Sequence, residues 1–245
     1  MSYRTIKYEK KGHIATIKLN HNRVAYEDLA RELQDACGEV NGDEGVYTVI
    51  LTGTGETFVD LSDAEKGERP LQGPAGAIAG IDRPVIVAMN GDAIGEGLEI
   101  ALSGDIRIAS DKARFAMPQS IHGRMPTDGG TQRLARIAGR GKAMEMLLTG
   151  EVITAAEALE TGLVSRVVTA EALAEEVQKL AETIAAKGPL AVRYLKEAVN
   201  KGMDMTLEQG LRLEADLYFL LHTTADRTEG IKAFREKRPP EFKEK

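Results

Sequence analysis

Short runs of hydrophobic residues, alternating with polar ones, fill the first half of the chain. Residues 14–19 alternate between the two sides of an extended chain, which predicts a strand. Residues 27–40 carry Leu29, Leu33 and Cys37 at four-residue spacing, which is typical of one face of a helix. Further apolar runs predict strands at residues 47–51, 85–89, 106–109 and 114–117. This β-β-α order favours helices packed on stacked sheets.

After about Gly139 the pattern becomes helical. It predicts helices at residues 142–148, 155–161, 170–186, 189–201 and 207–221, with one strand at 164–168. Thr154 is expected to cap the second of these helices. The break at Gly188-Pro189 divides the chain into a core, residues 1–188, and a C-terminal helical region, residues 189–245.

The helix expected at residues 207–221 is apolar at Leu207, Leu211, Leu217, Phe219 and Leu220. So much apolar surface must be buried against something, and in a terminal segment that is often another subunit. We therefore expect the C-terminal region to pack on the core and on a neighbouring subunit.

The charge balance and residue usage narrow the range of partners. The net charge is −6 and Trp is absent, so neither a basic face nor a stacking surface for nucleic acid is expected. Cys37 is the single cysteine, which fits a reducing, cytoplasmic location. Residues 1–11 lack the apolar core of a signal peptide, and no run approaches the roughly 20 residues of a membrane span. Four scattered histidines offer no metal-ligand spacing, so no metal is expected.

Three segments have the residue types that chemistry needs, at residues 53–63, 90–102 and 117–134. In the second, a strand runs through Gly95 and Gly97 into a helix that carries Glu99 in its first turn. N–H groups at a helix start bind anions, and glycines let a ligand approach the backbone. The third contains Gln119, His122 and Asp128 ahead of another helix.

Each segment also has a plainer interpretation. A glycine-rich turn can be a simple connection, and a glutamate in a first helical turn can merely complement the helix dipole. His122 could be a solvated loop residue. Asp128 could cap the helix that Thr131 or Gln132 begins.

The ordered combination of motifs resembles the crotonase (enoyl-CoA hydratase/isomerase) superfamily over nearly the whole chain. The resemblance lies in residues 83–91 (RPVIVAMNG), 95–101 (GEGLEIA), 105–109 (DIRIA), 129–134 (GGTQRL), 148–150 (LTG), 155–158 (AAEA), 162–164 (GLV) and 229–234 (EGIKAF). It implies an α/β fold: a crotonase-type spiral of β-β-α units with a C-terminal helical oligomerisation region. It is much less specific for the reaction, because one fold hosts many chemistries.

The resemblance also implies roles for individual residues. The backbone N–H groups of Ser62 and Glu96, with Gly97 adjacent, would hold a thioester carbonyl in an oxyanion hole. Glu99 matches the first of the two glutamates that hydratases of this family use as base and acid. Gln119 stands where the second is expected, and an amide cannot transfer a proton as a carboxylate does.

Asp128 is a candidate replacement for the missing carboxylate. Some β-diketone hydrolases of the family resemble this chain in placing an aspartate there, with a histidine at the position of Gln119. His122 lies three residues further on and is a candidate substrate contact. Leu61 replaces an expected glycine, and the segments 19–26 and 63–83 are shorter than usual, so the CoA and acyl sites could be altered.

Three functions remain open at this point. The leading one is an acyl-CoA hydratase or isomerase that acts through an enolate, with Glu99 as acid/base and Gln119 as positioner. A C–C bond hydrolase of a cyclic or β-diketone, using Glu99 and Asp128, is the second, and a catalytically silent assembly or binding protein is the third. The resemblance implies no cofactor beyond the coenzyme A of the substrate, a homotrimer or homohexamer, and contacts from Phe234 and Lys243 to bound CoA.

Overall fold

A six-stranded sheet organises the core of the protein. The computed structural model describes residues 3–20, 24–62 and 73–243 of the 245-residue chain. The strand order is β1-β2-β4-β6-β8-β11, with β1 antiparallel to β2 and every other neighbouring pair parallel. The strands are β1 (Ile6–Lys11), β2 (Ile14–Leu19), β4 (Thr48–Gly53), β6 (Val85–Met89), β8 (Ile106–Ser110) and β11 (Arg166–Val168).

Two smaller sheets lie beyond the ends of the main strands. One has the order β10-β9-β7 and the other pairs β3 with β5. Their strands are β3 (Val24–Ala25), β5 (Leu61–Ser62), β7 (Ala93–Ile94), β9 (Arg114–Ala116) and β10 (Ile153–Thr154). The helices are α1 (Tyr26–Gly42), α2 (Pro74–Ala79), α3 (Glu96–Leu102), the 3₁₀ helix η1 (Pro118–His122), α4 (Gly130–Ile137), α5 (Gly139–Thr149), α6 (Ala155–Glu160), α7 (Leu173–Ala185), α8 (Pro189–Gly202), α9 (Leu207–His222) and α10 (Ala225–Glu236).

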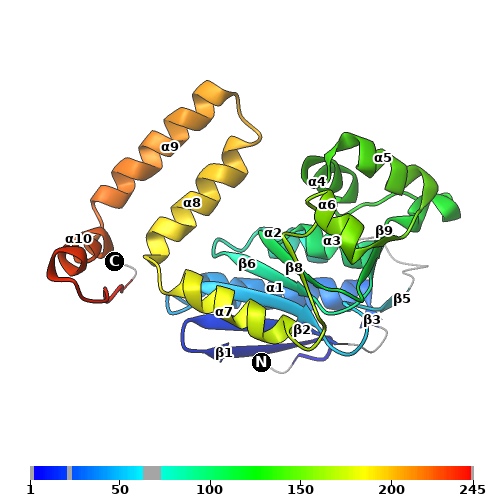
Figure 1. Cartoon of the computed structure of the whole chain (residues 1–245), viewed down its shortest axis with the longest axis horizontal. Coiled ribbons are helices and arrows are strands. Elements are labelled where there is room, and N and C mark those ends of the chain that lie inside the picture. Colours follow the sequence, from blue (N-terminus) through cyan, green and yellow to red (C-terminus); the bar gives the residue numbers. More distant parts are fainter. Residues whose placement is uncertain (1–2, 21–23, 63–72, 244–245) are drawn as a thin grey trace.

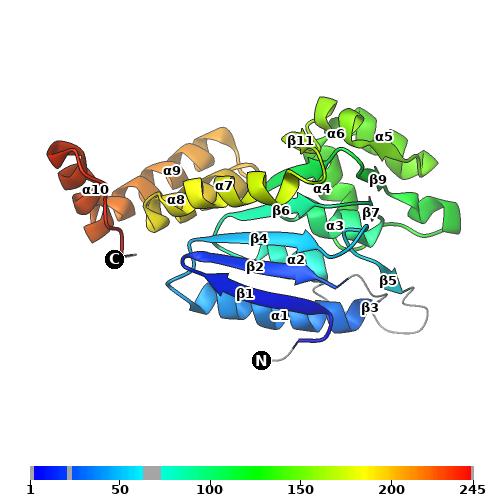
Figure 2. The ribbon, with the colours of Figure 1, turned by 60° about the horizontal axis from the view of Figure 1, so that its bottom comes forward.

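Helices cover both faces of the main sheet, as Figure 2 shows. Ile50 and Ile86 are neighbours in the sheet and belong to the apolar cluster under α7. Leu51 and Val87, the next pair, belong to the larger cluster that includes residues of α1, α2 and α3. A parallel sheet buried on both faces requires apolar residues at successive positions, which explains the uninterrupted apolar run of β6.

The turn after β6 joins the main sheet to the segments that carry the candidate site. Asn90 Oδ1 accepts a hydrogen bond of 3.0 Å from Gly53 N–H, and its Nδ2 donates to the carbonyls of Gly55 and Thr57. A side chain on Gly91 would lie 1.7 Å from the Glu56 carbonyl oxygen. Asn90-Gly91 therefore fixes the chain after β4 against the chain after β6, where only glycine leaves room.

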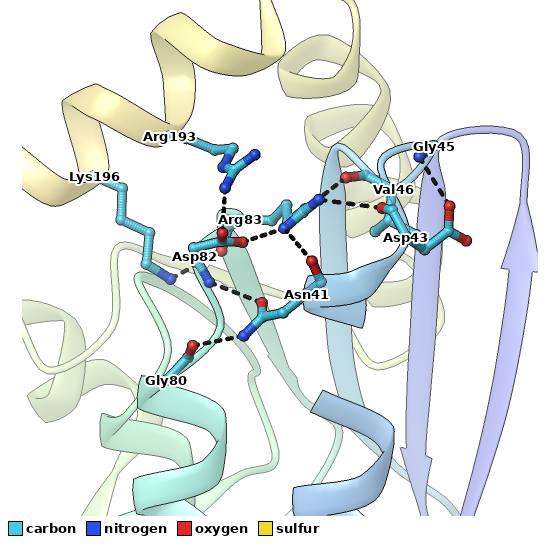
Figure 3. Close-up of polar contacts among 9 residues, drawn as sticks. All are labelled: Asn41, Asp43, Gly45, Val46, Gly80, Asp82, Arg83, Arg193 and Lys196. Atoms are coloured by element: carbon cyan, nitrogen blue, oxygen red, sulfur yellow. Dashed lines mark hydrogen bonds and ion pairs between the residues drawn. The ribbon is translucent and has the colours of Figure 1, made fainter. Parts of the chain in front are cut away.

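A buried arginine fixes the opposite end of these elements (Figure 3). Arg83 donates to the carbonyls of Asn41, Asp43 and Val46 around the end of α1, and it pairs with Asp82. Arg193 of α8 also pairs with Asp82, while Lys196 of α8 binds Asp105 at 2.7 Å and the Arg83 carbonyl at 2.9 Å. These contacts attach the C-terminal helices to the core.

Helices α8, α9 and α10 extend away from the core as an arm (Figure 1). Along α9, Leu207, Leu211, Phe219 and Leu220 are exposed and only Leu217 is buried. The apolar stripe predicted for this segment is therefore present and uncovered in a single chain. The predicted division at residue 188 stays a prediction; α8 begins at Pro189.

Most of the predicted elements are confirmed. The strands predicted at 14–19 and 85–89 are β2 and β6, and the helix predicted at 27–40 lies within α1. The predicted Thr154 cap is confirmed: Glu157 N–H donates to Thr154 Oγ1, and the Glu157 carboxylate accepts from Thr154 N–H. Strand β1 and helices α2 and α10 were not predicted.

Candidate active site

The candidate site is built around the sharp turn between β7 and α3. Gly95 has φ +58° and ψ −121°, a conformation that residues with a side chain rarely adopt. Its N–H donates to the Ala116 carbonyl of β9, and its carbonyl accepts from the N–H groups of Leu98 and Glu99. This turn places Glu96 as the first residue of α3, where N–H groups point out of the helix end.

The segment that leads to Ser62 runs beside this turn. Thr57 and Asp92 form a parallel bridge, and Phe58 N–H donates to the Asp92 carbonyl at 3.0 Å. A side chain on Gly97 would lie 3.0 Å from Val59 Cγ1, so the two segments remain close as far as α3. Ser62 then ends β5, the strand that pairs with β3. The two expected oxyanion residues thus come from neighbouring backbone segments.

Glu99 is fully buried beneath the turn. Its Oε1 accepts hydrogen bonds from the N–H groups of Asp128 at 2.7 Å and Gly130 at 2.9 Å. Its Oε2 is buried and has no partner among the described residues. Burial raises the pKa of Glu99 above its ordinary value, the two N–H donors oppose that shift, and the charges of Asp128 and Glu96 add to it. A raised pKa suits a carboxyl that must hold and release a proton near neutral pH.

Gln119 is the second buried polar group of the site. It lies in η1, is 4% exposed, and neither its Oε1 nor its Nε2 has a partner among the described residues. Its Nε2 lies 3.5 Å from the position that a side chain on Gly95 would occupy. Because a buried unpaired polar group costs about 1–3 kcal/mol, such an amide usually serves a ligand or a water molecule.

Asp128 lies next to Glu99 but its carboxylate faces another helix. The plainer interpretation of Asp128 as a cap for α4 is wrong, because Gly129 is the N-cap of that helix and no side chain caps it. The Asp128 carboxylate instead accepts from the N–H groups of Ala75 at 2.7 Å and Gly76 at 3.2 Å, in the first turn of α2. The Tyr26 hydroxyl donates to it at 3.3 Å. Burial raises the pKa of Asp128, and these donors oppose the rise.

The three remaining expected contact residues are exposed. The side chain of His122 is exposed at the end of η1. Phe234 of α10 is 86% exposed, and Lys243, whose N–H donates to Asp226, follows the same helix. Figure 1 shows α10 at the end of the molecule opposite α3. Within one chain, the printed contacts gather Glu96, Gly97, Glu99, Gln119 and Asp128 around the turn between β7 and α3. The segment that leads to Ser62 lies beside it at Val59, whereas Phe234 and Lys243 lie at the other end of the chain's fold (Figure 1).

Within residues 3–20, 24–62 and 73–243, no cluster of three or more His, Cys, Asp or Glu side chains suits a metal ion. No helix in the same residues is long and apolar enough to cross a bilayer. Burial raises the pKa of Cys37 to about 12, so its thiol is not a ready nucleophile. Residues 21–23 and 63–72, which belong to the two segments expected to be shorter than usual (19–26 and 63–83), lie outside the described residues.

A buried glutamate beside a glycine turn and a short helix start, built on β-β-α units, is the arrangement of the crotonase class of proteins. The sequence of residues 9–245 matches the family model described as enoyl-CoA hydratase/isomerase. The chain belongs to this family, and the predicted fold class is confirmed.

Similar proteins extend over the full length of the chain. It is 39% identical to the crotonyl-CoA hydratase of Syntrophomonas wolfei, with 99% of both chains covered. It is 37% identical to the short-chain-enoyl-CoA hydratase of Clostridium acetobutylicum, with 97% of both covered. The crystal structure of the enoyl-CoA hydratase from Bacillus anthracis superposes with a TM-score of 0.91 at 36% identity, covering 99% of this chain and 100% of that one.

Proposed function

We infer that this protein is an enoyl-CoA hydratase/isomerase-type enzyme that acts on an acyl-CoA thioester through an enolate. The observation that carries the proposal is Glu99: a fully buried carboxyl with one oxygen held by two N–H groups and the other without a partner among the described residues. Coenzyme A enters as part of the substrate, and the reaction needs no other cofactor.

The oxyanion hole carries the electrostatic part of the reaction. The N–H groups of Ser62 and Glu96 donate to the thioester oxygen, on which negative charge grows as the enolate forms. Fixed donors of this kind are typically worth about 3–4 kcal/mol each in transition-state free energy. Gly97 leaves the backbone open beside the thioester, because no side chain projects from it.

Glu99 acts first as the general base and then as the general acid. In hydration, the carboxylate takes a proton from water while the water oxygen bonds to the β-carbon of the enoyl thioester and the π electrons move onto the thioester oxygen. The enolate then collapses and the α-carbon takes the proton back from Glu99. Atoms and charges balance with a single carboxyl, so this hydration requires no second glutamate.

Gln119 takes the place of that second glutamate as a positioning group. Its amide offers both an acceptor and donors to a water molecule or the substrate. Gln119 Nε2 lies near Gly95, one residue before Glu96. The amide is therefore close to the turn between β7 and α3, which carries the proposed oxyanion donor of Glu96. His122 contacts a more exposed part of the ligand.

A neighbouring subunit completes the CoA-binding part of the site. The exposed apolar side chains of α9 support a homotrimer, or a homohexamer made of two trimers. Since Phe234 and Lys243 lie far from Glu99 in their own chain, a neighbouring copy brings them to the CoA of this one. The single cysteine supports a reducing, cytoplasmic compartment.

The test is a substrate panel combined with thermal unfolding. Crotonyl, cinnamoyl and dienoyl CoA esters are followed by the absorbance of the conjugated thioester, and a 1,3-diketone is included. We expect turnover of at least one 2-enoyl-CoA ester. A CoA ester at 100 times its Kd should stabilise the fold by about 2.7 kcal/mol, which raises Tm.

Other outcomes separate the alternatives. Turnover of the diketone, with no Tm shift by any CoA ester, indicates C–C bond hydrolysis and overturns the proposal. Binding of CoA esters without turnover of any substrate indicates a silent member of the family.

A further inference from the structure

The turn formed by residues 128–130 determines the orientation of the Glu99 carboxyl. The N–H groups of Asp128 and Gly130 both donate to Glu99 Oε1, which leaves Oε2 as the oxygen available to a ligand. A side chain on Gly130 would lie 3.0 Å from both Oε1 and Cγ of Glu99, so the turn lies directly against the carboxyl. Any movement of this turn moves the Glu99 carboxyl with it.

Asp128 is the residue through which the turn is held. Its N–H donates to Glu99, and its carbonyl accepts from Arg133 Nη1 at 2.7 Å. Its carboxylate accepts from the first turn of α2 and from the Tyr26 hydroxyl. Each polar group of Asp128 therefore has a protein partner, which suits a structural anchor better than a group that exchanges protons with a substrate.

The close fit extends to the neighbouring glycine. A side chain on Gly73 would lie 2.2 Å from the Tyr26 hydroxyl and 2.3 Å from Asp128 Oδ2. Tyr26 itself is buried and begins α1, so its hydroxyl is held in place by the helix. Three segments far apart in sequence, at residues 26, 73–76 and 128–130, thus meet at one carboxylate.

We propose that Asp128 and Tyr26 are positioning residues that lock the 128–130 turn, so that Glu99 presents Oε2 alone to the reacting atoms. The role rests on the proposed acid/base function of Glu99. It assigns Asp128 to orientation rather than proton transfer, and it adds Tyr26 to the machinery.

Asp128 also acts on Glu99 electrostatically. The charged groups that raise the pKa of Glu99 are Asp128 and Glu96, after the larger effect of burial. Asp128→Asn removes one of these charges and keeps the backbone N–H that binds Oε1. The pKa of Glu99 should then fall, a change that a purely structural defect would not produce in a defined direction.

The experiment uses the full chain with the variants Asp128→Asn and Tyr26→Phe. Tyr8→Phe is the matched control, because the buried Tyr8 hydroxyl has no hydrogen-bond partner among the described residues. Steady-state kinetics on a 2-enoyl-CoA ester give kcat and KM against pH. The pKa of Glu99 is read independently from the ¹³C carboxyl resonance that Glu99→Gln removes.

We expect kcat to fall about 10–100-fold in Asp128→Asn, within the range that misplacement of a catalytic group produces, with KM little changed. The acid limb of kcat/KM and the ¹³C titration of Glu99 should both move to lower pH. Tyr26→Phe should lower kcat several-fold and shift the Glu99 resonance, whereas Tyr8→Phe should match the wild type.

A full kcat and an unmoved Glu99 titration in Asp128→Asn would overturn the positioning role and leave the proposed function intact. If the wild type turns over no enoyl ester, the proposed function fails, yet the ¹³C titration still decides whether Asp128 and Tyr26 act on Glu99. A shift in Tyr8→Phe equal to that in Tyr26→Phe would also contradict the proposal.

Discussion

Replacing Gly130 by alanine tests how closely the 128–130 turn fits against Glu99. The added methyl would lie 2.7 Å from Pro126 Cβ and 3.0 Å from Glu99 Oε1 and Cγ. Carbon atoms normally stay roughly 3.5–4.0 Å apart, so the turn or the carboxyl must move by about 1 Å. Overpacking of this kind costs about 1–3 kcal/mol of unfolding free energy, and a 1 Å misplacement of a catalytic group costs about 10²-fold in rate.

The assay compares Gly130→Ala with Gly141→Ala, a helical glycine of α5 that has no atom within 4 Å of the added methyl. For a chain of this size, we expect Gly130→Ala to lower Tm by roughly 3–9 °C and kcat by about 10²-fold. Gly141→Ala should keep full activity and an equal or slightly higher Tm, because alanine is the better helix former. Wild-type activity and Tm in Gly130→Ala would refute the close fit.

Two further predictions concern the charge of Glu99 and the exposed apolar face of α9. Because the pKa of Glu99 is raised in the folded protein, ionising it costs stability as pH rises above the ordinary glutamate value near 4.3. Glu99→Gln should therefore raise Tm at pH 7–8, with the gain fading as pH falls to about 4; a gain independent of pH, or a loss at neutral pH, would contradict this. Phe219→Asp places a charge on the exposed apolar stripe of α9. It should reduce the mass measured by sedimentation, and a wild type that is already monomeric would contradict the assembly proposal.

The elements that could be predicted from the sequence are those with a strong local pattern. Strand β6 is buried at all five positions, and its apolar run gave the correct bounds. The N-cap at Thr154 was predicted because a cap is encoded at one position beside the helix, and the structure adds the reciprocal bond from Glu157. Strand β1 was missed, since only Ile6 of its six residues is buried and the rest resembles a polar loop. Helix α2, PAGAIA, is too short and too rich in glycine and alanine to give a helical pattern.

The features of the candidate site also differ in whether a local sequence pattern encodes them. The glycine turn at residues 95–97 and a helix with Glu99 in its first turn were predicted, because they lie in one continuous motif. The burial of Glu99 was not predicted. The contact of Asp128 with α2 joins residues more than 50 positions apart, and that with Tyr26 spans 102 positions. No local spacing encodes such contacts. The sequence therefore indicated that Asp128 matters near Glu99, and the fold was needed to show which atoms it contacts.

We propose that Glu99 is the single carboxyl that transfers protons at the turn between β7 and α3. The most direct test is the initial rate of crotonyl-CoA hydration by the wild type and by Glu99→Gln, with folding checked by Tm. We expect turnover by the wild type and a loss of about 10²–10⁴-fold in the variant, the usual contribution of general acid–base catalysis. Equal rates in the two proteins would contradict it.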